Sequence, residues 1–339
     1  MKKISVIGAG SWGSTLALLL YENGHDVTLY TKGQKHYEEL SQKHTNSRYL
    51  ENITFPEGIT YTYDLKKATQ SAECVVLAVT SQATREVLKQ MKPHLKPDAV
   101  VVNVSKGLEL GTNLLLSQVY EEVIGNENFA VLSGPSHAEE VSVKIPTAVV
   151  CASKKEEISK DVQKIFSNNY FRVYTNSDVI GVEVGGALKN IIALGSGISD
   201  AIGYGANTRA AIITRGISEI SRFGKKLGAN PLTFLGLTGV GDLIVTCNSK
   251  LSRNKRAGAL IAKGYNAKQI TEQIHMVVEG IPTTKAVYEF AKANNISMPL
   301  TDAIYDVIYE SHDIKDTVKR LMNRNMKEEN LTEDMFINL

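Results

Sequence analysis

Three glycines near the start of the chain have the spacing of a phosphate-binding turn. Gly8, Gly10 and Gly13 stand in the segment GAGSWG. In such a turn the first glycine permits the tight bend, the second leaves room for a pyrophosphate, and the third lets a helix pack closely on a strand. A β-branched run precedes the turn and a helical pattern follows it, so unpaired N–H groups at the helix start would face the phosphates. This context predicts a dinucleotide-binding site.

A lysine follows the second predicted strand, residues 26–31, where NAD-specific sites usually carry an acidic residue. A carboxylate at that position would repel a ribose 2′-phosphate, whereas the ammonium group of Lys32 would attract it. The sequence therefore predicts that NADPH is accepted as well as NADH, and leaves the preference open. The alternative is that Lys32 is only a solvated lysine at a strand end.

A second candidate for chemistry is Lys189, which closely follows Gly185 and Gly186 in an otherwise apolar helical segment. Each glycine inside a helix costs about 1 kcal/mol relative to alanine, so close approach of a ligand or another helix must offset that cost. Lys189 either extends its ammonium group to solvent or lies in a cleft, where it would act on a ligand.

Polar residues follow two further predicted strands, at the edge where Rossmann sheets bind ligands. Lys106 comes after residues 99–104, and Gly134 and Ser136 come at the end of residues 129–134. Ser136 and Glu139 also have the spacing of a capping box, so helix capping is the alternative role of Ser136.

Two more segments in the second half have residues suited to binding. Asp242 is flanked by glycine in GVGDL, which indicates either a functional carboxylate or a simple turn. Ser252, Arg253 and Asn254 stand at a predicted helix start. A guanidinium beside the free N–H groups of a helix is suited to a phosphate.

The elements that must position these residues fall into two halves. Short apolar runs at residues 3–7, 26–31, 74–79, 99–104, 129–134 and 147–152 predict strands buried on both faces of a parallel sheet, with helices between them. From residue 179 onward helical patterns replace the strands. We therefore predict an α/β protein, with an N-terminal doubly wound Rossmann domain over residues 1–178 and an all-α domain over residues 179–339.

Composition excludes several classes of protein. The formal charge of +2 argues against a nucleic-acid partner. Cys74, Cys151 and Cys247 form no disulfide framework or metal motif, so we expect no metal and a reducing, cytoplasmic location. The first residues lack the pattern of a signal peptide, and no stretch is expected to span a membrane. A homodimer is one option for the assembly, which the sequence does not fix.

The motifs together resemble those of the bacterial NAD(P)-dependent glycerol-3-phosphate dehydrogenases. They are GAGSWG (8–13), SKGLE (105–109), LSGPSHAEEV (132–141), GGALKNI (185–191), GVGDLIVTC (239–247), SRN (252–254) and VVEG (277–280). The resemblance implies a two-domain enzyme that interconverts dihydroxyacetone phosphate and sn-glycerol 3-phosphate with NADPH or NADH, in the service of glycerophospholipid synthesis.

The resemblance also implies roles for individual residues. Lys189 would be the proton donor or acceptor. The implied contacts with the small phosphorylated substrate are Lys106, Gly134, Ser136, Lys189, Asp242, Ser252, Arg253 and Asn254. The implied cofactor contacts are Gly8, Gly10, Ser11, Trp12, Gly13, Lys32, Tyr49, Lys106, Ala138, Arg253, Val277 and Glu279.

The chemistry of ketone reduction fits a lysine in this role. As hydride reaches the carbonyl carbon, negative charge grows on the oxygen, and a nearby ammonium group both stabilises that charge and supplies the proton. A free lysine has a pKa of about 10.4, which is poorly matched to neutral pH. We expect burial and a second cation such as Lys106 to lower the pKa of Lys189, and Asp242 to oppose that shift.

Two other functions remain open at this stage. A β-hydroxyacid dehydrogenase has a similar two-domain plan, and Arg253 could bind a substrate carboxylate instead of a phosphate. A redox-sensing protein would hold NADPH without turnover. Lys189 beside paired glycines counts against the second option, because sensing needs no proton donor.

Overall fold

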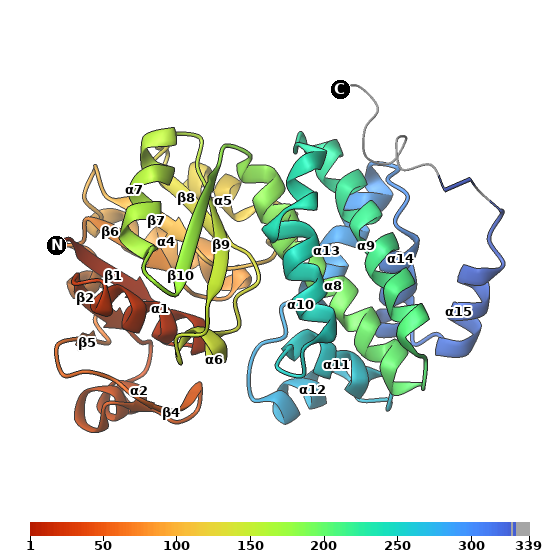
Figure 1. Ribbon diagram of the computed structural model, residues 1–339, viewed down its shortest axis with the longest axis horizontal. Coiled ribbons are helices and arrows are strands. Elements are labelled where there is room, and N and C mark those ends of the chain that lie inside the picture. Colours follow the sequence, from red (N-terminus) through yellow and green to blue (C-terminus); the bar gives the residue numbers. More distant parts are fainter. Residues whose placement is uncertain (327, 330–339) are drawn as a thin grey trace. The chain divides into compact units, whose positions relative to one another are not determined.

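The computed structural model describes residues 1–326, 328 and 329, and its chain divides into two compact units (Figure 1). The first unit comprises Met1–Ser105 and Leu116–Val179; the second comprises Lys106–Leu115 and the chain from Ile180 onward. The sequence-based boundary at residues 178/179 left 106–115 in the first domain. This segment joins the helical unit because Leu108 and Leu115 are buried in its apolar core.

A twisted sheet forms the centre of the first unit, in the order β10-β9-β8-β7-β6-β1-β2-β5. Its strands are β1 (Lys3–Ile7), β2 (Asp26–Tyr30), β5 (Thr60–Thr62), β6 (Cys74–Leu77), β7 (Val100–Asn103), β8 (Phe129–Ser133), β9 (Thr147–Ala152) and β10 (Phe171–Asn176). From β5 to β8 all pairs are parallel, with the Rossmann crossover between β1 and β6. This arrangement and the helical second unit confirm the predicted fold class.

Helices and short connections cover and link the strands of this sheet. They are α1 (Ser11–Glu22), α2 (Gln34–Glu38), α3 (Leu65–Thr69), α4 (Thr84–Met91), α5 (Leu116–Val123), α6 (Ala138–Val141) and α7 (Glu156–Phe166). A small hairpin of β3 (Thr45–Asn46) and β4 (Leu50–Thr54) follows α2. The apolar faces of α1 and α7 pack with the strands in one continuous core.

Three features of the sheet differ from the sequence-based expectation. Strand β5, which pairs parallel to β2 at one edge, was not expected, because its segment TYT has no apolar run. Strand β9 runs antiparallel to β8, with Leu132 opposite Cys151, although its apolar sequence resembles that of the parallel strands. Strand β10 was not expected, because its outward residues, such as Arg172 and Tyr174, interrupt the apolar run. It pairs parallel to β9 and extends the sheet at the far edge.

The second unit is helical in its described part. Its elements are α8 (Val179–Ala201), α9 (Ala206–Leu227), α10 (Asp242–Asn248), α11 (Arg253–Ile261), α12 (Ala267–Ile274), α13 (Gly280–Ala293), α14 (Pro299–Tyr309) and α15 (Ile314–Met322), with irregular turns at Pro231–Leu235 and Leu237–Gly241. The predicted helical character of residues 330–339 lies outside the described residues.

The central helix of this unit is α8. Contrary to the sequence-based expectation, its length and composition would allow it to cross a membrane, but 89% of its apolar stretch is buried inside the protein. Val184, Leu188 and Ile191 are among its side chains in the core. The helix is therefore the core around which the neighbouring helices pack.

Glycines bring neighbouring backbones unusually close to α8. A Cβ atom on Gly197 would lie 2.0 Å from the carbonyl oxygen of Lys255, and one on Gly258 would lie 2.1 Å from that of Leu194. Helices α8 and α11 therefore cross with their backbones in contact. A Cβ on Gly185 would lie 2.6 Å from the carbonyl oxygen of Thr238, which identifies one partner of the paired glycines predicted to permit a close approach.

The crossing of α8 and α11 yields a stability test. Replacing a helix-interior glycine by alanine usually gains about 1 kcal/mol. We expect Gly258→Ala instead to lower the free energy of unfolding by about 1–3 kcal/mol, because the new methyl group collides with backbone. Arg256→Ala, at an exposed position of the same helix, should change it by less than about 0.5 kcal/mol. Urea unfolding followed by circular dichroism measures both, and equal stabilities would contradict the close crossing.

Candidate active site

The predicted phosphate-binding turn connects β1 to α1. Gly8 has a φ of +117°, and a Cβ there would lie 2.4 Å from the carbonyl oxygen of Ala78. A Cβ on Gly13 would lie 1.9 Å from the carbonyl oxygen of Gly8, whereas one on Gly10 would have no atom within 4 Å. Two of the glycines are thus required by the protein's own packing, and the third leaves open space.

That open space lies at the start of α1. Gly10 is the N-cap residue and has no side chain to bond the first N–H groups of the helix. Ser11 and Trp12 form the first turn, and the Trp12 ring packs 6.3 Å from that of Phe171. A helix start without a side-chain cap, beside a glycine with free space, fits a pyrophosphate group.

At the end of β2 a hydrogen-bond network leads back to this turn. The His36 ring bonds the hydroxyl of Thr31 at 2.8 Å and the side-chain oxygen of Asn46 at 3.0 Å. The Asn46 amide donates to the carbonyl oxygen of Ala9 at 3.0 Å and to the Ser14 hydroxyl at 2.8 Å. The network fixes the loop after β2 against the glycine-rich turn.

Two residues predicted to contact the cofactor adjoin this network. Lys32 is exposed directly after Thr31. The Tyr49 ring lies 5.5 Å from that of His36, with the guanidinium of Arg48 above it at 5.1 Å. Neither His36 nor Asn46 stands in a motif, and Asn46 acquires its role from Ala9 and Ser14, which only folding brings near.

The segment after β8 contains three of the predicted contacts. Gly134 has a φ of +144° and packs against Val149. The Ser136 hydroxyl donates to the carbonyl oxygen of Gly134 at 3.0 Å, and α6 starts two residues later without a side-chain cap. The alternative role of Ser136 as a helix cap is therefore wrong. The carbonyl oxygen of Ala138 accepts from the Thr15 hydroxyl at 3.3 Å, which places Ala138 beside α1.

In the second unit three charged residues meet around one carboxylate. One oxygen of Asp242 lies 2.5 Å from the Lys189 ammonium nitrogen, and the other lies 2.6 Å from that of Lys106. Asp242 is 1% exposed and Lys189 is 7% exposed. Lys189 therefore does not extend to solvent, and Asp242 is more than a residue of a turn.

The electrostatics of this cluster follow from burial and charge. Burial lowers the pKa of Lys189 to about 8; the charge of Asp242 opposes that shift and the charge of Lys106 adds to it. These are the directions expected from the sequence. Burial by itself would raise the pKa of Asp242, but the two lysines hold it below its usual value. The cluster therefore pairs one carboxylate with two ammonium groups.

Thr246, which the sequence did not single out, completes the surroundings of Lys189. Its hydroxyl accepts a hydrogen bond from the Lys189 ammonium group at 2.8 Å and donates to the backbone carbonyl of Asp242 at 2.6 Å. It stands four residues after Asp242 on α10, so both side chains lie on one helix face. That spacing was the signal available in the sequence.

A second chain of bonds ties α11 and α13 to α8 next to Lys189. The Asn254 amide donates to the side-chain oxygen of Asn190 at 2.9 Å, and the backbone N–H of Gly280 donates to Asn254 at 2.9 Å. Asn254 is thereby fixed to Asn190, the residue that directly follows Lys189.

The remaining predicted contacts surround the start of α11. Ser252 is its N-cap and accepts from the backbone N–H of Lys255 at 3.2 Å. Arg253 is exposed and donates to the carbonyl oxygen of Val277 at 3.4 Å. Glu279 stands at the N-cap position of α13. The structure thus brings Arg253 and Val277 together.

Comparison with known proteins places this arrangement in a family. Family models for the N-terminus and C-terminus of NAD-dependent glycerol-3-phosphate dehydrogenase match residues 3–159 and 178–319. The chain belongs to the NAD-dependent glycerol-3-phosphate dehydrogenase family. The chain is 50% identical over 327 residues to a glycerol-3-phosphate dehydrogenase [NAD(P)+] of Bacillus pumilus, covering 96% of this chain and 95% of the relative.

Solved structures of the glycerol-3-phosphate dehydrogenase family agree with this assignment. The enzyme from Coxiella burnetii is 38% identical, with a TM-score of 0.91 over 95% of this chain and 99% of the other. That from Saccharomyces cerevisiae is 29% identical, with a TM-score of 0.80 over 94% and 98%. Membership confirms the resemblance inferred from the motifs.

The glycine-rich turn provides a test that separates binding from folding. Gly10→Ala adds a methyl group to open space, so we expect an unchanged melting temperature but NADPH binding weakened at least about tenfold, or about 1.4 kcal/mol. Gly13→Ala should instead lower the melting temperature, because its methyl group meets the backbone of Gly8. Thermal unfolding and NADPH fluorescence titration measure the two effects. Unchanged NADPH affinity in Gly10→Ala would show that the phosphates lie elsewhere.

Proposed function

We propose that this chain reduces dihydroxyacetone phosphate to sn-glycerol 3-phosphate, reversibly, with NADPH or NADH. The observation that carries the proposal is the buried Lys189, whose pKa is lowered to about 8 and whose ammonium group bonds Asp242 and Thr246. Family membership of nearly the whole chain supports the substrate and the cofactor.

The first unit would hold the cofactor, which when bound supplies or accepts a hydride at its nicotinamide ring. The N–H groups at the start of α1 and the free space at Gly10 suit the pyrophosphate. Lys32, Tyr49, Ser11, Trp12 and Ala138 are the further contacts that we propose.

The lysines of the second unit would stabilise the negative charge that develops on the substrate and supply the proton. When hydride reaches C2 of the ketone, the Lys189 ammonium group stabilises the charge growing on oxygen and then donates its proton. Asp242 and Thr246 hold the ammonium group in one position. Lys106 supplies a second positive charge that favours an anionic substrate.

For the substrate phosphate we propose the start of α11. The first N–H groups of this helix and the guanidinium of Arg253 favour an anion. Asn254, fixed by Asn190, and Ser252 would add hydrogen-bond donors. Val277 and Glu279 are proposed cofactor contacts. Gly134 and Ser136 are proposed to contact the substrate, as the family resemblance implies.

We further propose a cytoplasmic enzyme that supplies glycerophospholipid synthesis, as a monomer or a homodimer. The three cysteines are free thiols and buried, which supports a reducing compartment. Sedimentation distinguishes the two assemblies.

The direct test of the proposed function follows NADPH and NADH oxidation at 340 nm. We expect turnover with dihydroxyacetone phosphate and little with 2-oxo or 3-oxo carboxylates of similar size. Preference for the carboxylates would favour the β-hydroxyacid dehydrogenase alternative. NADPH binding without turnover of any ketone would favour a redox sensor.

The pH dependence tests the role of Lys189. Reduction needs the protonated lysine, so kcat should fall as pH rises through about 8, whereas oxidation of glycerol 3-phosphate should rise through the same value. Asp242→Asn removes the charge that raises this pKa and should move both curves to lower pH. Lys106→Met removes the charge that lowers it and should move them to higher pH. Shifts in the same direction would contradict this electrostatic account.

Arg253→Ala tests the phosphate site. A hydrogen bond to a charged group contributes about 1.5–3 kcal/mol, so kcat/KM for dihydroxyacetone phosphate should fall by one to several powers of ten, with a much smaller loss for unphosphorylated dihydroxyacetone. Arg256→Ala, another exposed arginine of α11, is the matched control. Equal fractional losses on both substrates would show that Arg253 does not bind the phosphate.

Lys32→Asp tests the choice of cofactor. The new carboxylate would repel the 2′-phosphate but could bind a free 2′-OH, so the Kd for NADPH should rise much more than that for NADH. Lys35→Asp, an exposed lysine three residues on, is the control and should leave the ratio of the two Kd values unchanged. An equal effect of Lys32→Asp on both cofactors would place Lys32 away from the adenosine ribose.

A further inference from the structure

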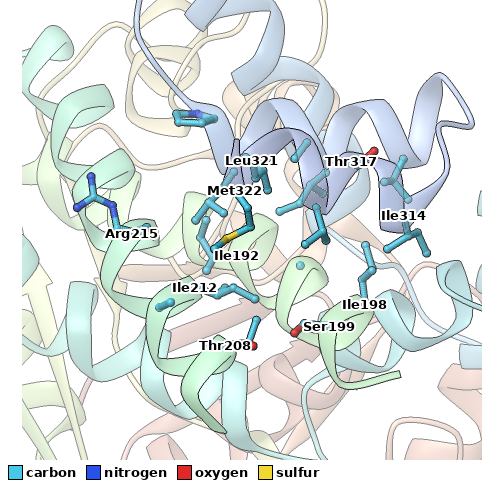
Figure 2. Close-up of a pocket in the computed structure, with 18 of the residues that line it drawn as sticks. Ile192, Ile198, Ser199, Thr208, Ile212, Arg215, Ile314, Thr317, Leu321 and Met322 are labelled. Atoms are coloured by element: carbon cyan, nitrogen blue, oxygen red, sulfur yellow. The ribbon is translucent and has the colours of Figure 1, made fainter. Parts of the chain in front are cut away.

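Two features of the described chain lie outside the proposed catalytic cluster. One is a cavity of about 670 Å³ among α8, α9, α14 and α15, lined by aliphatic side chains such as Ile192 and Ile212 (Figure 2). The other is the set of hydrogen bonds around His36 and Asn46 in the first unit. None of the residues that line the cavity is a proposed contact of substrate or cofactor, whereas the His36 ring packs against the proposed cofactor contact Tyr49. The second feature is therefore the one that bears on cofactor binding.

Asn46 is the centre of these hydrogen bonds, and it is 0% exposed. Its amide nitrogen donates to the carbonyl oxygen of Ala9 at 3.0 Å and to the Ser14 hydroxyl at 2.8 Å. Its side-chain oxygen lies 3.0 Å from Nε2 of His36, and its backbone oxygen accepts from the N–H of Tyr49 at 3.1 Å. Asn46 therefore connects the glycine-rich turn and α1 to His36 and Tyr49.

The chemistry of the partners fixes the direction of each bond. A backbone carbonyl only accepts, so the amide nitrogen of Asn46 must face Ala9. The Asn46 oxygen then faces His36, and Nε2 of that ring must carry the hydrogen that this oxygen accepts. In the neutral ring Nδ1 is an acceptor, so the Thr31 hydroxyl donates to it across 2.8 Å. From Ala9 to Thr31, each group thus determines the orientation of the next.

The two ends of this connection lie at two places that one cofactor molecule must reach. Ala9 belongs to the glycine-rich turn, which suits the pyrophosphate, and Thr31 directly precedes Lys32, which suits the 2′-phosphate of NADPH. Both phosphate groups belong to the same molecule, so the groups that bind them must be held at a fixed separation. Hydrogen bonds from His36 toward both places supply that support.

We propose that His36 is a positioning residue for NADPH. Through its Nε2 bond to Asn46 and its Nδ1 bond to Thr31, it holds the loop that carries Lys32 in place relative to the glycine-rich turn. The 2′-phosphate and the pyrophosphate are then bound together. This role rests on the proposed cofactor site, and it gives His36 no contact with the reacting atoms.

Two substitutions of His36 separate the two halves of the connection. Glutamine places an amide N–H near the position of Nε2 and can still donate to Asn46, whereas asparagine reaches only as far as Nδ1 and loses that bond. In NADPH fluorescence titrations of the full chain, the Kd of His36→Gln should stay within about twofold of wild type. That of His36→Asn should rise about five- to tenfold, the effect of one lost hydrogen bond. A wild-type Kd in His36→Asn, or equal losses in the two variants, would overturn the proposal. If His36→Asn does not fold, Thr31→Val removes the other end of the connection and should give the same loss.

Coupling to Lys32 shows whether His36 acts through this lysine. Lys32→Met should raise the Kd for NADPH in the wild-type background, and by much less in the His36→Asn background, where the ammonium group is already displaced. Lys35→Met, at an exposed position three residues on, should have the same effect in both backgrounds. Equal effects of Lys32→Met in the two backgrounds, or none in either, would overturn the proposal. Turnover of dihydroxyacetone phosphate by the wild-type chain is measured separately, so the proposed function can hold where this inference fails.

Discussion

Asp242 lies between two lysine ammonium groups, one on each carboxylate oxygen, in the interior of the helical unit. Burying a lone charge costs several kcal/mol, so neither Lys189 nor Asp242 would remain ionised there without a partner. The carboxylate starts α10, where the helix dipole favours negative charge. One acid and two bases leave a net positive charge, suited to a phosphorylated substrate and to negative charge growing on a carbonyl oxygen.

Close backbone contacts keep this cluster in place. Gly185, Gly197, Gly258 and Gly280 each have backbone atoms of a neighbouring segment where a side chain would otherwise lie. Gly185 admits the turn before α10, Gly258 brings α11 against α8, and Gly280 brings α13 against α8. All three contacts lie within a few residues of Lys189 along α8. Because these glycines have no side chains, the helices pack with their backbones in contact. The lysine therefore has few alternative positions. This rigidity is what a proton donor with a fixed geometry requires.

Much of this organisation could be predicted from the sequence, because short-range patterns determine it. Strands β1, β2, β6, β7, β8 and β9 follow from apolar runs, and the turn at Gly8 follows from glycine spacing next to a strand. The short strands β3, β4 and β5 lack such runs and were not predicted. The direction of the Lys189 pKa shift followed from the burial expected of an apolar helix and from the charge of Lys106. The antiparallel direction of β9 could not be predicted, because an apolar run has no direction. His36, Asn46 and Thr246 were missed, since their importance comes from partners that only the folded chain brings near.

The central claim is that burial lowers the pKa of Lys189 to about 8, with Lys106 adding to that shift and Asp242 opposing it. Lysines labelled with 13C at Cε report their own titration by NMR, and the Lys189 signal is identified by its loss in Lys189→Arg. The structure predicts a midpoint near pH 8 for this signal, well below the value of about 10.4 for a free lysine. A midpoint at about 10.4, the value of a free lysine, would contradict the account.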